Sequence, residues 1–347
     1  MIKSHLFVIF NLLFNSVAAI NSTECSSSGH EKWFCRYMAI HDKHYESVVE
    51  MKSRMTHLNR QKVINNKMNS DNVQFGLTSR SDLFSHEKKY NNALVQRKHT
   101  LQKRAPEIQH VALKTLDRLP PIDWRKHNGN SYVSSIKDQD ACGCCFSFAA
   151  ATVLEFWAAP QGYPKSISPQ HLMDCTSVDN YPNSGCDGGL MEYVFDYAKN
   201  HPVLLEQDNP YKDKQTVCNR HNEWSHVQIY DYKVLTRNQY PDAEKQMEQL
   251  LHLYGPISIG IDSENMDNYQ GGIFKADMCG TDIDHAVTIV GYTKNAWIIK
   301  NSWGPYWGEN GYLYLEKGKN ACGVAEYAVY IKNAAPVLKK MPTHWYH

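Results

Sequence analysis

The chain has 347 residues, of which 42% are hydrophobic and 21% charged. This length and composition exclude disorder throughout and allow a globular protein of two subdomains with appended segments. The net charge of +1 gives no reason to expect a nucleic acid partner. The charges are unevenly distributed along the chain. Residues 20 to 118 contain 17 Lys and Arg and 10 Asp and Glu, a net charge of +7, whereas residues 119 to 347 contain 19 Lys and Arg and 26 Asp and Glu, a net charge of −7. Such opposition suits an N-terminal segment that docks on the rest; two solvated surfaces of chance composition are the alternative.

The first 19 residues have the pattern of a secretory signal peptide. Lys3 precedes an apolar stretch over residues 6 to 14, and the small residues Val17 and Ala19 stand at cleavage-site spacing. The stretch is too short to cross a bilayer as a helix, and we find no run of 18 apolar residues elsewhere. We therefore expect a soluble protein, secreted or lysosomal, without a membrane span. Ten cysteines in such a protein indicate disulfides.

Residues 20 to 118 differ in composition from residues 119 to 347. From residue 31 to about 69 the sequence is polar with few Gly or Pro, which predicts a surface-type helix without a core of its own. Two basic clusters between residues 97 and 104 predict an extended connector that proteases can reach. The sequence therefore predicts a signal peptide over 1–19, a leader over 20–118 and a main domain over 119–347.

The main domain changes from helical to β-rich along its length. Residues 145 to 159 are nearly apolar on every face, which predicts a helix buried within a domain. Ser168 and Pro169 predict the N-cap and first turn of a second helix toward Met173, and a third helix is expected from Leu190 to Asn200. Short β-rich runs follow at residues 257–261, 286–292, 296–299, 312–315 and 327–331. A helical half before a β half predicts an α+β fold.

Cys145 and three distant polar residues are candidates for thiol chemistry. A nucleophilic thiol needs a lowered pKa, a base and donors for an oxyanion. Cys145 begins the buried helix, where backbone N–H groups and the helix dipole favour a thiolate. His285, before a strand, can pair with it, and Asn301 can hold the far side of that imidazole under the cover of Trp303. Gln139, six residues before the cysteine, can donate to an oxyanion beside the Cys145 N–H. Taken alone, His285 and Asn301 would be ordinary structural residues.

These residues lie in motifs that resemble the papain family of cysteine peptidases, with cathepsin L as the closest pattern. The resemblance covers residues 119 to about 332 and implies a two-subdomain fold, with a helical left half, a β-barrel-like right half and the active site in the cleft. The matching segments are Asp123-Trp124-Arg125, Lys137-Asp138-Gln139, Cys142-Gly143-Cys144-Cys145, Gly185-Cys186-Asp187-Gly188-Gly189-Leu190-Met191, Gly255-Pro256, Asp284-His285-Ala286-Val287 and Lys300-Asn301-Ser302-Trp303-Gly304.

The leader resembles the helical inhibitory propeptide of the same family, though loosely. Its helical motif keeps the spacing of three residues, Glu50, Arg54 and Leu58. Its second motif keeps Gly76, Asp82 and Glu87. In that second motif Thr78 and Arg80 replace the family's Asn and Phe.

The resemblance implies a cysteine endopeptidase made as a zymogen. In the implied acyl transfer, the Cys145 thiolate attacks a peptide carbonyl, His285 protonates the leaving amine and then serves as base for hydrolysis, Asn301 orients His285, and Gln139 holds the oxyanion. The implied disulfides are Cys142–Cys186, Cys175–Cys218 and Cys279–Cys322, with Cys25 and Cys35 left as a further candidate pair in the leader. The implied substrate-binding residues are Gly188, Gly189, Leu190, Met191, Gly260, Ile283, Ala286, Trp303 and Tyr327.

The implied pocket for the second side chain before the cleaved bond, the P2 residue, is apolar. Its floor falls at Tyr327, which predicts a shallow pocket that prefers medium-sized hydrophobic residues such as Leu or Val. We expect polypeptide substrates, the chain's own propeptide as an intramolecular inhibitor, a monomer, and no cofactor or metal.

Three residues beside the nucleophile depart from the family pattern. Cys144 stands for Ser or Ala, Phe146 for Trp or Tyr, and Asp140 for Gly. Cys144 is either a small buried filler, a redox partner of Cys145, or part of a zinc site with Cys142 and Cys145, and the first interpretation is favoured. Asp140 either opposes charge at the oxyanion or points into water. These departures motivate an alternative function, that of a catalytically inactive relative retained as a binding or inhibitory protein. Exopeptidase activity lacks a recognisable anchoring loop.

Overall fold

The computed structural model describes residues 19–27, 29–91, 93–94, 119–159, 162, 165–178, 181–219 and 227–336. The predicted signal peptide and the two basic clusters lie outside these residues, apart from Ala19. The chain forms two compact units, Met1–Arg60 and Gln61–His347. None of the described helices has both the length and the apolar composition that crossing a membrane requires.

The first unit consists of short helices. They are α1 (Ser22–Ser27), α2 (Lys32–Ile40) and the first part of α3 (Val48–Met68). The sequence predicted one helix over residues 31 to 69, but the chain leaves the helical path after α2, where Asp42 takes a φ of 49°. A disulfide joins Cys25 to Cys35, and Arg54 pairs with Glu50 one turn away at 3.0 Å.

Three helices of the second unit lie close to where the sequence predicts them, namely α5 (Cys145–Trp157), α6 (Pro169–Cys175) and α7 (Met191–Asn200). Two more, α4 (Ser85–Asn91) and α8 (Ala243–Tyr254), were not predicted. The side chain of Ser168 accepts a hydrogen bond from the His171 N–H at 2.9 Å and so caps α6, with Pro169 in its first turn. Residues 145 to 155 of α5 are all buried, as expected of a helix that is apolar on every face.

The strands of the second unit form one mixed sheet. They are β1 (Val73–Phe75), β2 (Ile122–Asp123), β3 (Val227–Leu235), β4 (Ile257–Ile261), β5 (Tyr269–Phe274), β6 (His285–Tyr292), β7 (Ala296–Lys300), β8 (Tyr312–Glu316) and β9 (Ala328–Pro336). The order is β1-β5-β8-β7-β6-β4-β9-β3, with β2 paired to β6. Because β1 and β3 are the two ends of this path, the described strands form an open sheet, and the expected β-barrel-like half is not a closed barrel.

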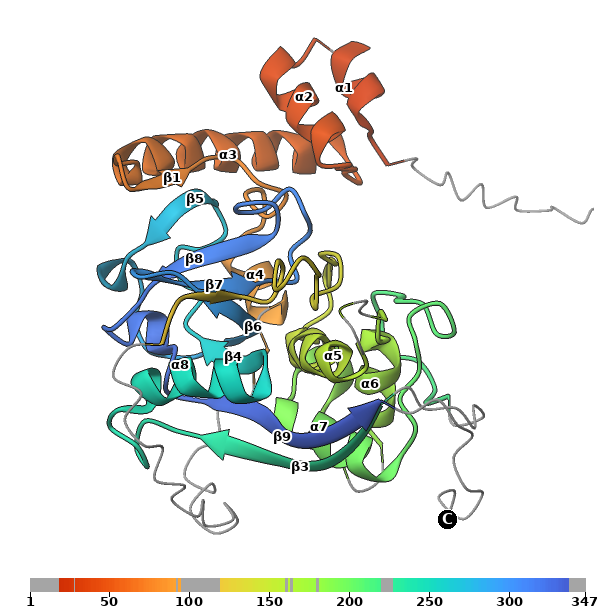
Figure 1. Cartoon of the computed structure of the whole chain (residues 1–347). Coiled ribbons are helices and arrows are strands. Elements are labelled where there is room, and N and C mark those ends of the chain that lie inside the picture. The colour runs from red at the N-terminus through yellow and green to blue at the C-terminus, as the bar shows by residue number, and fades with distance from the viewer. Residues whose placement is uncertain are drawn as a thin grey trace, which may run out of the picture. The chain divides into compact units, whose positions relative to one another are not determined.

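Two cores meet at helix α5. One core lies under β4 to β8, and the other combines α5, α6 and α7 with residues of β3 and β9. Figure 1 shows α5, α6 and α7 gathered beside the sheet, with β5 to β8 on the other side of α5. The hydroxyls of Ser258 and Thr288 both donate to the Ala149 carbonyl at 3.0 Å, which ties α5 to β4 and β6. The first turn of α5 and the start of β6 are thereby held together.

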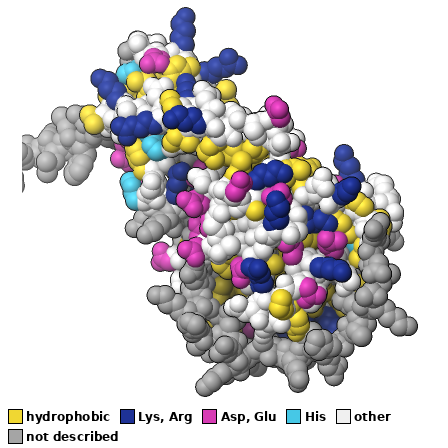
Figure 2. All heavy atoms as spheres, turned by 90° about the vertical axis from the view of Figure 1, so that its left-hand side faces the viewer, with side chains coloured by type: hydrophobic (Ala, Val, Ile, Leu, Met, Phe, Trp, Pro, Cys, Tyr) yellow, Lys and Arg dark blue, Asp and Glu magenta, His cyan; other side chains and the backbone are white. Residues whose placement is uncertain are grey.

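Charged side chains of both signs share the surface. Figure 2 shows one face of the molecule, on which both Lys and Arg side chains (dark blue) and Asp and Glu side chains (magenta) are exposed.

Candidate active site

The imidazole of His285 is fixed by its two neighbours in space. His285 begins β6, and Asn301 directly follows β7, the strand that pairs with β6. The Nε2 atom of His285 lies 2.8 Å from Oδ1 of Asn301, and the ring stacks on Trp303 with 4.7 Å between the ring centroids. Trp303 is 1% exposed, so it shields the His–Asn hydrogen bond from water. The Nδ1 atom of His285 is buried and has no hydrogen-bond partner in the described part of the chain.

Cys145 lies at the first turn of α5, fully buried. Burial raises the pKa of its thiol to about 11, although backbone hydrogen bonds from Ala286 and Ala93 favour the thiolate. The contact with Ala286 brings the thiol next to the start of β6 and hence to His285. The sequence led us to expect a favoured thiolate at the helix N-terminus, and in this form of the chain burial outweighs that effect.

Gln139 is held in a single orientation by hydrogen bonds at both ends of its amide. Its Nε2 donates to the Cys142 carbonyl at 3.0 Å, and its Oε1 accepts from the Ser302 hydroxyl at 2.6 Å. The side chain is fully buried. Gln139 and the N-terminus of α5 are thus close neighbours through the loop that contains Cys142, as a shared oxyanion site requires.

Cys144 contacts Tyr211, which in turn is hydrogen-bonded to Gln139. The sequence did not predict these contacts. The Sγ atom of Cys144 lies 3.2 Å from the hydroxyl of Tyr211, and that hydroxyl donates to the Gln139 carbonyl at 2.7 Å. Burial raises the pKa of the Cys144 thiol to about 12. Cys142 is bonded to Cys186, which leaves it unavailable to a zinc site. Cys144 therefore fits the description of a buried filler with one polar partner.

Asp140 is exposed, and it takes the place of the family's usual Gly in a left-handed conformation with φ 49°. Its N–H is bonded to Asp138 at 3.0 Å, and its charge, after burial, helps to raise the pKa of Asp213. Of the two interpretations of Asp140, the exposed side chain matches the one that points into water.

The leader crosses the site through Ala93 and Leu94. The Ala93 carbonyl accepts from the Gly189 N–H at 3.1 Å, and the Leu94 N–H donates to the Asp284 carbonyl at 2.9 Å. This backbone pairing runs parallel between Leu94 and Gly189. A Cβ added to Gly188 would clash with the Ala93 carbonyl at 2.0 Å, so a glycine is required where the leader approaches.

The Leu94 side chain is buried in the pocket that the resemblance assigned to P2. A Cβ added to Gly260 would lie 2.7 Å from Leu94 and 3.0 Å from Ile283. The same apolar cluster contains four more of the expected substrate-binding residues, namely Leu190, Met191, Ala286 and Tyr327. Trp303 belongs to the other core and contacts His285 instead of this pocket.

Glu192 is a pocket residue that the sequence did not indicate. Its carboxylate accepts a hydrogen bond from the Tyr327 hydroxyl at 3.2 Å, and both side chains are 5% exposed. The bond fixes the ring of Tyr327 at the base of the pocket. No local pattern signals this pair, because the two residues lie 135 positions apart.

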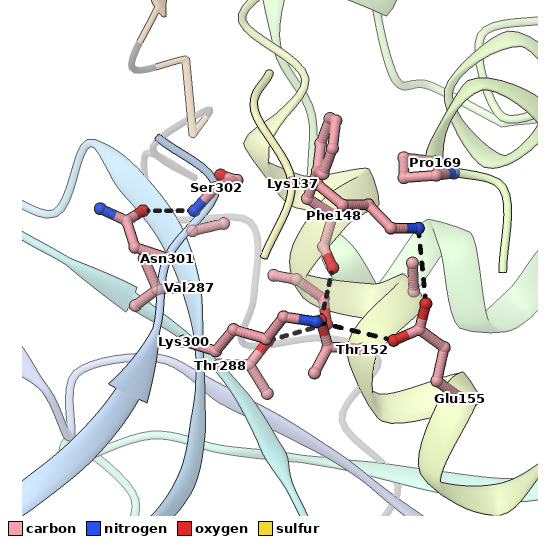
Figure 3. A pocket seen from close by; sticks show the side chains of 13 residues that line it. Lys137, Phe148, Thr152, Glu155, Pro169, Val287, Thr288, Lys300, Asn301 and Ser302 are labelled. Atoms are coloured by element: carbon pink, nitrogen blue, oxygen red, sulfur yellow. Dashed lines mark hydrogen bonds and ion pairs between the residues drawn. The ribbon is translucent and has the colours of Figure 1, made fainter. Parts of the chain in front are cut away.

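A buried ionic network connects the helix that begins with Cys145 with the strand that leads to Asn301. Glu155 on α5 lies 3.5 Å from the Lys137 ammonium and 3.7 Å from that of Lys300, the last residue of β7 (Figure 3). Ser134 links them further, since it accepts from Lys300 at 2.8 Å and donates to Glu155 at 2.5 Å. Burial lowers the pKa of Lys300 to about 8, against the opposing effect of Glu155. Figure 3 shows Asn301 next to this network, with its Oδ1 bonded to the Ser302 N–H at 2.8 Å.

The structure contains the disulfides that the resemblance implied. They are Cys142–Cys186, Cys175–Cys218 and Cys279–Cys322, in addition to Cys25–Cys35. Cys144 and Cys145 are unbridged and buried. Within the described ranges, no group of three or more His, Cys, Asp or Glu side chains is placed to hold a metal ion.

Comparison with known proteins identifies the family. The model of the papain family of cysteine proteases matches residues 120–332, and the chain belongs to this family. Cathepsin F of Drosophila melanogaster is 32% identical over 314 residues, which are 85% of this chain and 49% of that protein. The oryzain gamma chain of Oryza sativa subsp. japonica is 38% identical over 218 residues, which are 60% of this chain and 58% of that protein. The chain thus spans about half to three fifths of the length of these two curated relatives.

The structural comparison includes the leader. Digestive procathepsin L 3 from the larval midgut of Tenebrio molitor superposes with a TM-score of 0.69 at 27% identity, over 88% of this chain and 98% of that one. The chain therefore has the architecture of a papain-family proenzyme, in which Ala93 and Leu94 of the leader lie against Gly189 and Asp284.

Proposed function

We propose that this chain is the zymogen of a cysteine endopeptidase in which Cys145, His285, Asn301 and Gln139 perform the chemistry. The observation that carries the proposal is the 2.8 Å bond between His285 and Asn301 under Trp303, beside the first turn of α5. The bond to Asn301 leaves Nδ1 of His285 as the nitrogen that exchanges a proton with the thiol.

The mechanism is acyl transfer. The Cys145 thiolate attacks the peptide carbonyl, and His285 gives its proton to the leaving amine, which departs with the C-terminal fragment. Water then attacks the thioester with His285 as base, and Cys145 is released as the thiol. Gln139 and the Cys145 N–H stabilise the oxyanion in both steps.

The P2 pocket takes a medium-sized hydrophobic residue. Its expected lining is Leu190, Met191, Gly260, Ile283 and Ala286, with Tyr327 as its floor, and Gly188 and Gly189 are further substrate-binding residues. Leu94 of the leader fills this space, which supports Leu as the preferred size. We further propose that the enzyme is a monomer that reaches a secreted or lysosomal location through its signal peptide, and that the mature enzyme begins near Leu119.

Hydrolysis of matched peptides tests the proposal. The acid-processed wild-type protein should cleave peptides with Leu at P2 at least about tenfold faster than peptides with Arg there. The Cys145→Ala variant, processed by added wild-type enzyme and repurified, should lose the activity, whereas Cys144→Ala should keep most of it. A preference for Arg would contradict the pocket assignment. Absence of hydrolysis by folded, processed wild-type protein would favour the inactive relative.

A further inference from the structure

A buried carboxylate next to the catalytic imidazole is occupied by two cations of the leader. Arg80 donates through Nε to Oδ1 of Asp267 at 2.7 Å, and the Lys88 ammonium lies 2.7 Å from Oδ2. Asp267 is 7% exposed and Arg80 is 5% exposed. Both carboxylate oxygens therefore have cationic partners, and both partners belong to the segment expected to leave on maturation.

The guanidinium of Arg80 also lies on an aromatic face. Its Cζ atom is 3.9 Å from the centroid of Trp303, whose ring stacks in turn on His285. A planar cation between a carboxylate and an indole is favoured by charge pairing and by cation–π attraction together. In the propeptide motif that the leader resembles, this position holds Phe, so the ionic contact is a feature of this chain.

The backbone that leads into Asp267 is anchored in the main domain. The Met266 carbonyl before it accepts from the Trp307 indole at 2.9 Å, and Met266 itself is fully buried. Glu264 and Asp284 line the hollow that Asp267 and Lys88 share, so the surroundings are acidic. Once the leader departs, the Asp267 carboxylate beside Trp303 loses both cations, and the space that they occupied becomes open to a cationic side chain of another peptide.

We propose that Asp267 and Trp303 form a subsite for a basic residue on the C-terminal side of the cleaved bond, and that Arg80 occupies this subsite in the zymogen. The proposal rests on the proposed function. His285 delivers its proton to the leaving amine, so the surface beside its Trp303 face meets the C-terminal fragment of the substrate. The Leu94 pocket lies in the other core and takes the N-terminal fragment.

The test compares Arg with citrulline, which has nearly the same shape but no charge. Internally quenched peptides carry Leu at P2 and either residue at the first or second position after the cleaved bond. At one of these positions, processed wild-type enzyme should show kcat/KM at least about tenfold higher for Arg, and the ratio should fall with added salt. The Asp267→Asn variant should bring the ratio close to one. A control, Asp277→Asn, changes an exposed carboxylate in the same half and should keep the wild-type ratio.

Equal cleavage of the two peptides by the wild type, or an unchanged ratio in Asp267→Asn, would overturn the subsite. A binding measurement keeps this outcome separate from failure of the proposed function. The Cys145→Ala protein, freed of its leader by an added endopeptidase, should bind the Arg peptide at least about tenfold more tightly than the citrulline peptide by calorimetry, and the additional Asp267→Asn change should remove the difference. If wild-type protein hydrolyses nothing while this binding difference persists, the proposed function fails and the subsite stands.

Discussion

Tyr211 occupies a key position among the single residues around the nucleophile. Its hydroxyl joins the Cys144 thiol to the carbonyl of Gln139, so the residue before the nucleophile and the proposed oxyanion donor share one partner. Burial raises the pKa of Tyr211 above its ordinary value, so the hydroxyl stays a neutral donor. The unusual Cys144 is thereby accommodated without a second reactive thiol.

Replacing Tyr211 with Phe should therefore affect stability and catalysis together. Loss of the hydroxyl leaves two buried groups with one partner fewer, which should cost about 1–2 kcal/mol of unfolding free energy in urea denaturation of the zymogen. The kcat/KM of the processed enzyme should fall several-fold because Gln139 is less firmly held. Tyr306→Phe removes a hydroxyl from a ring that is 72% exposed and should change neither quantity. An unfolding free energy of Tyr211→Phe equal to that of the wild type would contradict the stabilising role of the hydrogen bonds from Tyr211 to Cys144 and Gln139.

The sequence predicted which residues form the candidate site only where those residues lie within motifs. Cys145, His285, Asn301 and Gln139 each stand in a family pattern, and the structure brings the surroundings of all four together. Tyr211, Glu192 and Asp267 had no such signal. Their partners are 67 to 187 residues away in the chain, and only the fold places them side by side. Arg80 departs from the family pattern in the sequence, but only the fold places it against Asp267 and Trp303.

At the scale of elements, the buried network around Glu155 joins α5 to β7. Glu155 lies near the end of the helix that begins with Cys145, and Lys300 lies directly before Asn301. The two charges are 1% and 5% exposed, so neither can be solvated if the other is removed. The network therefore contributes to the distance between the elements that carry the nucleophile and the imidazole's partner.

Glu155→Gln should destabilise the zymogen by about 3–5 kcal/mol, because it leaves Lys300 without its buried counter-charge, whereas Lys137 keeps its pair with Glu206 at 3.2 Å. Denaturation in urea measures the change. The double variant Glu155→Gln, Lys300→Met should recover part of the loss, since the pair is removed together. Glu248→Gln serves as the control, because its pair with Lys317 is partly exposed and should be worth no more than about 1 kcal/mol. Equal effects of the two single Glu changes would contradict the assigned role.

Elements with strong local patterns were predicted well, and those that depend on partners were not. The apolar run of α5, the cap of α6 and the β-branched runs of β4, β6 and β7 formed where expected. The long leader helix was wrong at residues 41 to 47, where neither Gly nor Pro announces the break. β3 and α8 were missed, although Met247, Leu250 and Leu251 of α8 show a helical apolar spacing. Whether the sheet closes depends on pairing between distant strands, which no local pattern determines.

At the scale of the whole molecule, the leader keeps the site electrically neutral. Burial, with a contribution from Arg80, lowers the pKa of His285 to about 3, while the pKa of the Cys145 thiol is about 11. The thiolate–imidazolium pair is thus unfavourable while Ala93 and Leu94 cover the site. For Asp267, burial favours the neutral acid, but Arg80 and Lys88 outweigh it and hold the pKa below its usual range. That ion pair therefore survives mild acid and is lost only as the pH falls through the depressed pKa.

These shifts predict which group makes opening of the leader depend on pH. A His that titrates at about 3 when covered and near 6.5 when exposed binds an additional proton on opening between these values. The contribution of neutral His285 to the stability of the covered form over the open form is therefore complete above about pH 6.5 and decreases as the pH falls below that value. From this residue alone, the open fraction should be larger at pH 5 than at pH 7. Protonation of Asp267 is not required.

Labelling with an electrophilic active-site probe tests the central claim, that Cys145 is a nucleophile covered by the leader. Intact mass and peptide mapping identify the labelled thiol, and the rate for the unprocessed chain is divided by that for processed enzyme at the same pH. Processed protein should take up one label, on Cys145, while the zymogen is protected at pH 7 and is labelled at a higher relative rate at pH 5. Labelling on Cys144, no labelling of folded processed protein, or equal labelling of the zymogen and the processed enzyme at pH 7 would contradict the account.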